Sequence, residues 1–362
     1  MPSVRCYTSF TFSYLSRALV LLESLRRTHP DWQVWAVVVD QPPAGIDPAP
    51  LLAGFDRVLG LDDLAIPRPR AWLFKHDLVE ACTAVKGPAL LRLLDPDTDI
   101  AVYFDPDIAL FHPIEDVIAQ LETASIVLTP HQLEPNTSER RARGDEGTAL
   151  RYGVFNLGFL AVRNDANGRA FAAWWTTQLL RACYDDVPNG IFTDQKYVDL
   201  VPALFEGVHI MRDPGCNVAS WNISRRRLAF ALDGSLTVNG SPLKFYHFTK
   251  IGGIGDGATA AHGAENPEVL EVWHWYRRRI AAGPAVSAGW WHYGAFADGT
   301  PIPRAMRLLW RTQPEAMALF DDPFAVGPGS FREWALRQQT AASPSDSVMM
   351  HIEEDGCDDI PD

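Results

Sequence analysis

The chain has 362 residues, of which 47% are hydrophobic and 21% charged, and its formal net charge is −13. This composition is that of a globular protein and excludes a largely disordered chain. The acidic balance, without a face rich in Lys and Arg, argues against nucleic acid as the main partner, because clustered positive charge is what binds phosphate backbones.

The first third of the chain alternates predicted strands and helices. Residues 4–10 predict a strand, and residues 14–27 predict a helix that ends near His29-Pro30, since proline prevents its continuation. Short apolar runs at 33–39 and 99–104 are typical of buried parallel strands, and residues 72–85 predict a helix between them. This order favours a mostly parallel central sheet with helices on both faces.

The rest of the chain is less regular. We expect a loop with one short helix over 134–151, strands over 152–163, 208–211 and 244–248, and helices over 168–183 and 267–280. Asp233-Gly234 between apolar runs predicts a hairpin. The domain boundaries that we expect are a first domain over 1–250, a helical and aromatic C-terminal extension over 251–340, and a disordered tail over 341–362.

Two further features concern the compartment. No stretch reaches the roughly 18–20 apolar residues that span a bilayer, and the N-terminus lacks the apolar core of a signal peptide. The five cysteines have no CxxC spacing, so neither a zinc site nor a disulfide framework is indicated. We therefore expect a cytoplasmic protein with reduced thiols, without a transmembrane segment.

The motif that indicates chemistry is Asp105-Pro106-Asp107, which follows an apolar strand directly. Open α/β sheets bind ligands at the carboxyl ends of their strands, and paired carboxylates there suit a hard divalent ion shared with a diphosphate. Three Asp-x-Asp pairs occur in the chain, so the spacing alone means little. Only this pair has the strand before it, and the alternative is a solvated turn.

Three other positions deserve the same comparison of alternatives. Asn156 lies inside an apolar run and is either a ligand contact or a buried amide satisfied by the backbone. Thr193-Asp194-Gln195 opens a helix and is locally explained as an N-cap. His247 ends a late strand, where a lone histidine is more often a core or surface residue than a ligand.

Taken in chain order, these motifs resemble those of the retaining glycosyltransferases of family eight, the glycogenin and lipopolysaccharide-galactosyltransferase group with the GT-A fold. The resemblance runs from about Arg5 to Lys250. It implies a GT-A catalytic domain that binds a nucleotide sugar, with a UDP-sugar as the expected donor and Mn²⁺ or Mg²⁺ as cofactor. It also implies transfer with retention to a glycan, a lipid-linked saccharide met at the membrane face, or a protein, as in polysaccharide biosynthesis.

The resemblance assigns roles to individual residues. The metal ligands would be Asp105, Asp107 and His247, and the sugar would be contacted by Asn156. Asp194 would orient the sugar hydroxyls, and Gln195 would face the sugar opposite the leaving diphosphate. Contacts to the donor nucleotide and its phosphates are implied for the residues Thr8, Ser9, Lys86 and Lys250.

Two of these assignments depart from the family pattern. The family's His-Gly and Lys-Pro-Trp run is replaced by the segment from His247 to Lys250, so Lys250 stands near the expected position without its usual neighbours. The basic residue before the motif strand could be Lys75 or Lys86. We prefer Lys86, whose alternative explanation is a cation at a helix C-terminus.

The mechanism and the acceptor side leave alternatives open. Double displacement needs a carboxylate nucleophile, for which Asp194 is the candidate, whereas front-face attack needs none; we favour the latter. The glycine-rich residues 252–257 are either a segment that closes over the donor or a plain loop. The aromatic clusters 273–276 and 290–293 either stack on acceptor sugars or pack in the core.

Two other functions compete with sugar transfer. A sugar nucleotidyltransferase would carry a Gly- and Arg/Lys-rich loop after the first strand, and residues 8–13 contain neither glycine nor a basic residue. A non-catalytic carbohydrate-binding protein of the same fold is disfavoured by the intact set Asp105, Asp107 and His247.

Overall fold

The computed structural model describes residues 2–284, 286–287 and 289–341, and its contacts divide the chain into two compact units. The first unit contains the chain up to Pro69 and residues Leu78–His292, and the second contains Arg70–Asp77 and the chain from Tyr293 on. The first unit thus continues beyond residue 250, where the sequence places a boundary. The predicted tail, 342–362, lies outside the described residues.

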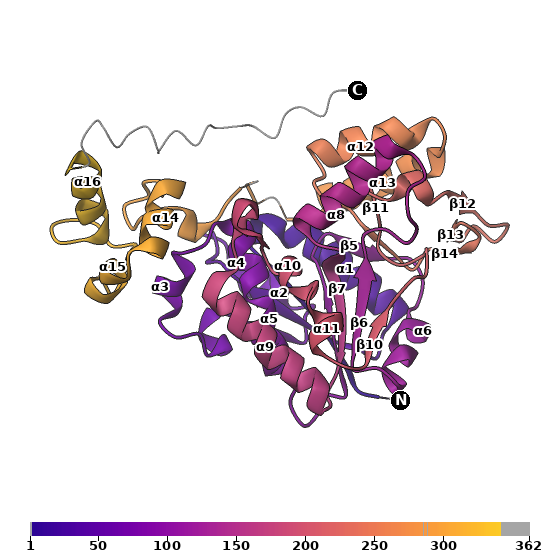
Figure 1. Ribbon diagram of the computed structural model, residues 1–362, viewed down its shortest axis with the longest axis horizontal. Coiled ribbons are helices and arrows are strands. Elements are labelled where there is room, and N and C mark those ends of the chain that lie inside the picture. Colours follow the sequence, from indigo (N-terminus) through magenta and orange to yellow (C-terminus); the bar gives the residue numbers. More distant parts are fainter. Residues whose placement is uncertain (1, 285, 288, 342–362) are drawn as a thin grey trace. The chain divides into compact units, whose positions relative to one another are not determined.

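A seven-stranded sheet forms the centre of the first unit, with the order β10-β6-β7-β4-β1-β2-β3 (Figure 1). All neighbouring strands are parallel except that β7 runs antiparallel to both β4 and β6. The strands are β1 (Val4–Phe10), β2 (Gln33–Val38), β3 (Arg57–Leu59), β4 (Ile100–Phe104), β6 (Ile126–Pro130), β7 (Phe155–Arg163) and β10 (Val208–Ile210).

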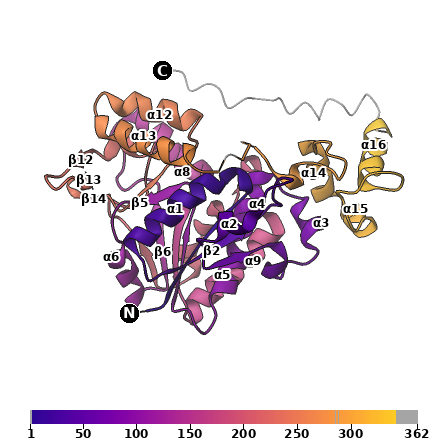
Figure 2. The ribbon, with the colours of Figure 1, turned by 180° about the vertical axis from the view of Figure 1, so that it is seen from behind.

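Helices cover both faces of this sheet, and every residue of β1 is accordingly buried. Cys6 and Phe10 pack into one apolar cluster with α1 (Leu15–Thr28), which is seen in front of the strands in Figure 2. Tyr7 and Ser9 point to the other side, where α4 (Leu78–Ala84) and α5 (Lys86–Leu93) accept their hydrogen bonds, and α9 (Ala166–Ala182) packs against α5. The mostly parallel α/β architecture with a helical C-terminal region is therefore confirmed.

In the described part of the chain, three small sheets accompany the central one, and the smallest pairs β8 (Asp185–Asp186) with β9 (Ile191–Phe192). The first has the order β11-β15-β5 and the second the order β12-β13-β14, which contains the predicted Asp233-Gly234 hairpin. Gly234 has a φ of 81°, the left-handed conformation that such a turn requires. The strands are β5 (Ile108–Leu110), β11 (Val218–Ala219), β15 (Phe245–His247), β12 (Leu228–Phe230), β13 (Leu236–Val238) and β14 (Ser241–Pro242).

The segment before β7 is more helical than expected. The predicted loop over 134–151 forms α7 (Glu139–Arg141), a π-helical turn (Ala142–Glu146) and α8 (Gly147–Tyr152). Local polar groups stabilise it: Ser138 Oγ accepts a hydrogen bond from the Arg141 amide, and the Glu146 carboxylate accepts one from the Asn136 amide. Sequence analysis by hydrophobic periodicity does not detect such polar contacts, and it therefore predicted only one short helix here.

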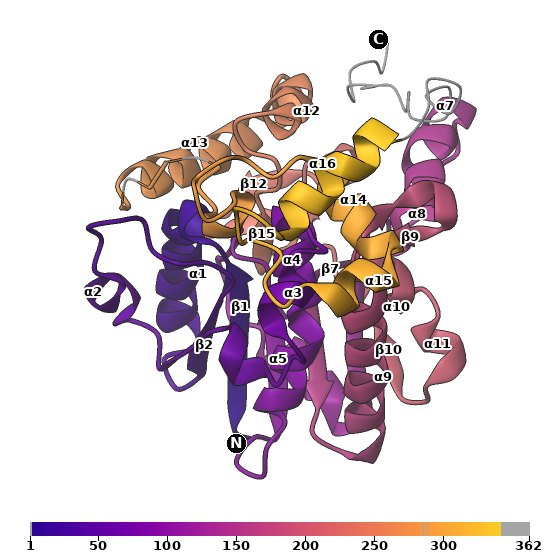
Figure 3. The same cartoon turned by 90° about the vertical axis from the view of Figure 1, so that its left-hand side faces the viewer.

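The glycine-rich residues 252–257 are not one continuous loop, contrary to the plain-loop alternative considered above. Helix α12 (Ile254–Gly263) begins inside them and packs against α13 (Pro267–Ala281), which lies next to α1 (Figure 3). Asp256 accepts hydrogen bonds from the Gly252 amide and the Trp273 indole, and this anchors the start of α12.

The aromatic clusters serve packing. Trp273 and Tyr276 on α13 are buried, and the Tyr276 ring stacks on Phe248 at 3.8 Å between centroids. In the other cluster, the indoles of Trp290 and Trp291 donate to the backbone carbonyls of Gln41 and Val39. The packing alternative therefore describes these four rings.

The second unit is built around Phe74, which explains why the predicted helix over 72–85 is divided. Its ring contacts Phe296, Trp310, Phe324 and Phe331, with centroids 5.0–6.1 Å apart. Residues 74–77 are therefore not helical, and Phe74 packs in this aromatic core. The helices here are α3 (Pro69–Leu73), of which residues from Arg70 belong to this unit, α14 (Arg304–Thr312), α15 (Pro314–Leu319) and α16 (Phe331–Ala341).

The remaining short helices of the first unit connect the larger elements. They are α2 (Pro48–Leu52), α6 (Glu115–Ile118), α10 (Gln195–Val198) and α11 (Val201–Leu204). Among the described residues, none of the helices combines the length and the apolar character that crossing a bilayer would demand.

Candidate functional site

The two carboxylates of the Asp-Pro-Asp motif lie in the turn between β4 and β5. The Asp105 amide donates to the Gly158 carbonyl at 2.8 Å, and the Ile108 amide donates back to the Asp105 carbonyl at 3.1 Å. The turn is therefore fixed both to β7 and to itself. Its position at the carboxyl end of a parallel strand is the place where open α/β sheets bind ligands.

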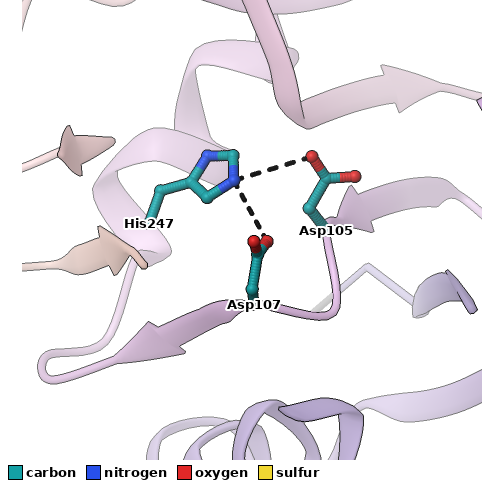
Figure 4. A group of neighbouring side chains, drawn as sticks. All are labelled: Asp105, Asp107 and His247. Atoms are coloured by element: carbon teal, nitrogen blue, oxygen red, sulfur yellow. Dashed lines mark ion pairs between the residues drawn. The ribbon is translucent and has the colours of Figure 1, made fainter. Parts of the chain in front are cut away.

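Strand pairing brings His247 to this turn. Strand β15 runs antiparallel to β5 with His247 opposite Ile108, and the Phe248 amide donates to the Asp107 carbonyl at 2.8 Å. The His247 Nε2 atom lies 3.1 Å from Asp107 Oδ1 and 3.8 Å from Asp105 Oδ2 (Figure 4). One donor atom from each of the three residues lies within 4.8 Å of the others.

This cluster has the composition of a divalent-cation site. Two carboxylates and one imidazole are ligands that Mn²⁺ accepts, and Mg²⁺ accepts the carboxylates. The side chains of Asp105 and Asp107 keep 24% and 13% of their surface exposed, so solvent reaches the oxygens, whereas His247 is only 5% exposed. These three side chains therefore fit a metal ion that the protein binds on one side and that solvent reaches on the other.

Electrostatics couple Asp107 and His247. Burial alone would raise the pKa of Asp107, but the facing imidazole holds it below its ordinary value. Conversely, burial alone would lower the pKa of His247, and the Asp107 carboxylate raises it above the ordinary value. Each group thus stabilises the charged form of the other.

Lys86, at the first position of α5, connects Asp105 to Asp194. Its ammonium lies 3.0 Å from Asp105 Oδ1 and 2.9 Å from Asp194 Oδ2, and it donates to the Leu157 carbonyl at 3.0 Å. Burial alone would lower the pKa of Lys86, but the two carboxylates raise it above its ordinary value. Lys86 is 2% exposed and is fully coordinated by these oxygens.

Asp194 and Gln195 lie beside this cation, at the start of α10. Burial raises the pKa of Asp194, although Lys86 offsets part of the effect. The preceding Thr193 has a φ of 45°, which is unfavourable for a β-branched residue, and its hydroxyl donates to Asp194 Oδ1 at 3.2 Å. Gln195 donates to the Tyr152 carbonyl at 2.8 Å. Asp194 flanks the first residue of α10, but its side chain makes no capping hydrogen bond, so the N-cap considered from sequence does not explain these residues.

Asn156 lies beneath His247. Its Oδ1 accepts from the Gly158 amide at 3.1 Å and from Asn217 Nδ2 at 3.0 Å, and lies 3.3 Å from His247 Nδ1. A Cβ at Gly158 would come within 2.6 Å of His247 Cε1, so only glycine admits the imidazole at this distance. The Asn-x-Gly spacing thus has a physical reason in this chain.

The remaining predicted residues lie at different depths. Thr8 and Ser9, near the end of β1, are buried, and the Ser9 hydroxyl donates to the Cys82 carbonyl at 2.8 Å. Lys250 is exposed on the turn that follows β15, with a φ of 52°. The structure therefore brings together six of the predicted residues: Asp105, Asp107, His247, Asn156, Lys86 and Asp194. Their predicted contacts with a nucleotide sugar stay predictions.

Several residues that contact this set were not singled out from the sequence. The Tyr103 hydroxyl donates to Asp105 Oδ1 at 2.7 Å, and its ring lies 4.4 Å from the Lys86 ammonium. On the other side, His131, Asn217 and Trp221 surround Asn156 and His247. Isolated polar residues of this kind have no local pattern, and only the placement of Tyr103 two residues before Asp105 offered a signal.

Comparison with curated proteins finds two relatives from Bacillus subtilis (strain 168). Both are described as uncharacterized: YfnD is 31% identical over 174 residues and YfnF is 30% identical over 179 residues. These matches cover 47% and 49% of this chain and 53% and 55% of the relatives. The chain therefore spans about half the length of the curated relatives it matches. No protein-family model matches it.

The solved structures to which the chain is similar include glycosyltransferases. The galactosyltransferase LgtC, in complex with donor and acceptor sugar analogs, has a TM-score of 0.46 at 15% identity over 79% of this chain and 98% of that chain. Mouse xyloside xylosyltransferase 1 gives 0.41 at 15% over 68% and 98%, and the bifunctional glycosyltransferase WbbM gives 0.44 at 14% over 78% and 50%. With TM-scores below 0.5, these likenesses by themselves decide neither fold nor activity.

Proposed function

We propose that this chain is a metal-dependent glycosyltransferase that transfers a sugar from a nucleotide-sugar donor, with UDP as the nucleotide, to a glycan, lipid-linked or protein acceptor with retention. The observation that carries the proposal is the cluster of Asp105, Asp107 and His247. Its three donor atoms come from two strand ends far apart in sequence and lie within 4.8 Å of one another. They stand at the edge of the sheet where α/β proteins bind ligands.

The cation that these residues would hold is Mn²⁺ or Mg²⁺. When bound, it would supply positive charge to offset the negative charge that develops on a departing nucleoside diphosphate. Partial exposure of the Asp105 and Asp107 oxygens supports access of phosphate to the same side. Lys250 is exposed three residues after His247, and we propose that it contributes a further cation there.

We propose that Lys86 positions a carboxylate and does not contact phosphate directly. Its ammonium already binds three oxygens, from Asp105, Asp194 and Leu157. We therefore infer that it holds Asp194 beside the metal ligands, where Asp194 would orient sugar hydroxyls. Gln195 follows Asp194 directly and would face the sugar, while Thr8, Ser9 and Asn156 stay proposed contacts on the donor side.

The environment of Asp194 bears on the route to retention. One of its oxygens is bound by Lys86 and the other accepts from Thr193, and the side chain is 4% exposed. A nucleophile must reach the anomeric carbon, and a carboxylate that is only 4% exposed and paired with an ammonium is poorly placed for attack, so this environment favours front-face attack over double displacement. In front-face attack, an oxygen of the leaving phosphate accepts the proton of the acceptor hydroxyl as the new glycosidic bond forms.

The experiment is a panel of nucleotide sugars incubated with the protein, with Mn²⁺ or with chelator, and read out as released nucleoside diphosphate. We expect release from at least one UDP-sugar that depends on the metal and is lost in Asp107→Asn. Binding of nucleotide sugar without release, with and without candidate acceptors, would favour a carbohydrate-binding protein. Normal release from a correctly folded Asp107→Asn protein would contradict the proposal.

A further inference from the structure

The two ring nitrogens of His247 have different environments. Nε2 faces the carboxylates of Asp105 and Asp107, and Nδ1 points away from them (Figure 4). Nδ1 lies 3.3 Å from Asn156 Oδ1. A neutral imidazole binds a metal only through the nitrogen that carries no proton. For Nε2 to be that nitrogen, the proton must reside on Nδ1, and its acceptor at 3.3 Å is the Asn156 side chain.

An asparagine side chain can present either its oxygen or its NH₂ group, and the two choices have opposite effects on His247. The neighbours of Asn156 agree on one choice. The Gly158 amide and the Asn217 NH₂ group both donate to Oδ1, at 3.1 and 3.0 Å. The Asn156 NH₂ group therefore points the other way, toward His131 Nε2 at 3.3 Å.

His131 can accept that hydrogen bond only in one tautomer. Its Nδ1 lies 3.3 Å from the Val154 carbonyl, which is an acceptor without a proton of its own. The His131 proton thus belongs on Nδ1, which leaves Nε2 as the acceptor for Asn156. Burial lowers the pKa of His131 to about 4, so the ring is neutral near pH 7.

Trp221 packs against both imidazoles. Its ring meets His131 edge to face at 5.4 Å and His247 at 5.1 Å, with interplanar angles of 67° and 85°. The indole thereby restrains the planes of the two rings between which Asn156 lies. The hydrogen bonds then all run in one direction. His247 Nδ1 donates to Asn156 Oδ1, the Asn156 NH₂ group donates to His131 Nε2, and His131 Nδ1 donates to the Val154 carbonyl.

We propose that His131 and Asn156 are positioning residues that set the tautomer of His247, so that its Nε2 lone pair is directed at the space between Asp105 and Asp107. Neither residue contacts that space itself. The inference rests on the proposed function in one respect, namely that a divalent cation binds there. The hydrogen bonds of His131 with the Val154 carbonyl and with Asn156 are a property of the metal-free chain and can be measured separately.

Three proteins test this: the wild type, His131→Phe and His131→Gln. Phenylalanine keeps a ring of similar size but offers no acceptor, so the Asn156 amide loses the partner that orients its NH₂ group. Glutamine places an amide oxygen near the position of Nε2 and restores an acceptor. Mn²⁺ affinity is measured by isothermal titration calorimetry, and the tautomer of His131 by ¹⁵N NMR of the metal-free wild type at alkaline pH.

We expect the metal-free wild type to carry the His131 proton on Nδ1. The His247 tautomer is diagnostic only with metal bound, because Asp107 Oδ1 lies 3.1 Å from His247 Nε2 and accepts a hydrogen bond from it in the metal-free chain. His131→Phe should bind Mn²⁺ about 10–100-fold more weakly, as loss of such outer partners usually does. His131→Gln should recover most of the affinity, whereas a general loss of packing would affect both variants alike.

The outcomes separate the two proposals. Unchanged Mn²⁺ affinity in His131→Phe, no recovery in His131→Gln, or a wild-type His131 protonated on Nε2 would each overturn the tautomer proposal. Mn²⁺ binding that Asp107→Asn leaves unchanged would instead overturn the proposed metal site. If His131→Phe does not fold, the wild-type spectrum still decides, because it needs no variant.

Discussion

The two sides of the candidate site are supported in different ways. On one side, which we term the neutral flank, uncharged Asn156 contacts His247, and Asn217 and His131 contact Asn156. On the other, which we term the ionic flank, Asp105 contacts the Lys86 ammonium, which also binds Asp194. Both flanks are largely buried, but only the second contains opposite charges in direct contact.

This difference separates two tasks. Neutral amides and imidazoles have donors and acceptors in defined directions, so the neutral flank determines where a lone pair points. An ammonium between carboxylates has little directional preference, but it compensates charge that would otherwise be costly to bury. We therefore expect changes in the ionic flank to reduce stability and changes in the neutral flank to reduce metal affinity.

The carboxylate that faces His247 directly should give the largest effect. Asp107→Asn removes a carboxylate from the cluster while preserving its shape, and we expect turnover to fall roughly a thousandfold or more, which corresponds to about 4 kcal/mol. Released nucleoside diphosphate is the measurement. Asp97→Asn is the matched control, since Asp97 belongs to an Asp-x-Asp pair in the exposed loop before β4, and it should leave turnover unchanged.

Lys86→Met breaks the ionic flank. It leaves Asp105 and the buried Asp194 facing each other without a cation, and we expect a loss of about 3–5 kcal/mol in the free energy of unfolding. Chemical denaturation at neutral pH measures it. Adding Asp194→Asn should restore part of the stability, because one buried charge is then removed.

The control for that change is an exposed ion pair. Arg143 lies 2.6 Å from Glu139 with both side chains about 80% exposed, so Arg143→Met should cost at most about 0.5 kcal/mol. A loss in Lys86→Met no larger than this would mean that the ionic flank does not compensate buried charge in the way the comparison requires.

Gly158→Ala disturbs the neutral flank by volume alone. Its Cβ would lie 2.6 Å from His247 Cε1 and 2.8 Å from Asn156 Oδ1, so the imidazole must move. We expect Mn²⁺ affinity to fall about tenfold, with an overpacking cost of about 1–3 kcal/mol. Gly147→Ala, where a Cβ meets nothing within 4 Å, is the control and should bind as the wild type does.

Gln195→Ala is expected to have the smallest effect and lies outside both flanks. Because Gln195 would act on the sugar, we expect turnover to fall about tenfold while the donor Kd changes little. Steady-state kinetics together with calorimetry of donor binding separate the two. If only donor affinity declines, Gln195 contributes to binding the nucleotide sugar and not to its reaction.

Much of the fold could be predicted because apolar runs report burial directly. Strand β1 agrees with the prediction residue for residue, and β2, β4, α1 and α13 agree within a residue or two. The division of the predicted helix at 72–85 could not be foreseen, since its cause is the contact of Phe74 with aromatic rings more than 200 residues away. The start of α12 among glycines likewise depends on Asp256 and Trp273.

The candidate site likewise contains residues that local sequence could predict and residues that depend on distant contacts. Asp105 and Asp107 could be proposed from sequence because they follow an apolar strand, and the order of motifs pointed to His247. The supporting residues could not: His131 and Asn217 are single polar residues whose meaning comes from the pairing of β15 with β5 and from the register of β7. Lys86 was predicted to bind the donor, and its contacts with Asp105 and Asp194 became visible only in three dimensions.

The reversed direction of β7 has a consequence for how such a protein can diversify. Because β7 runs against its neighbours, the chain enters it at the edge of the sheet where β4 and β6 leave, and Phe155 pairs with Pro130 at the end of β6. The connection between β6 and β7, residues 131–154, therefore adjoins the metal cluster without belonging to the sheet. Insertions or deletions there would alter the surroundings of the site while the strand order is preserved. Substrate range can accordingly change in this connection at little cost to folding.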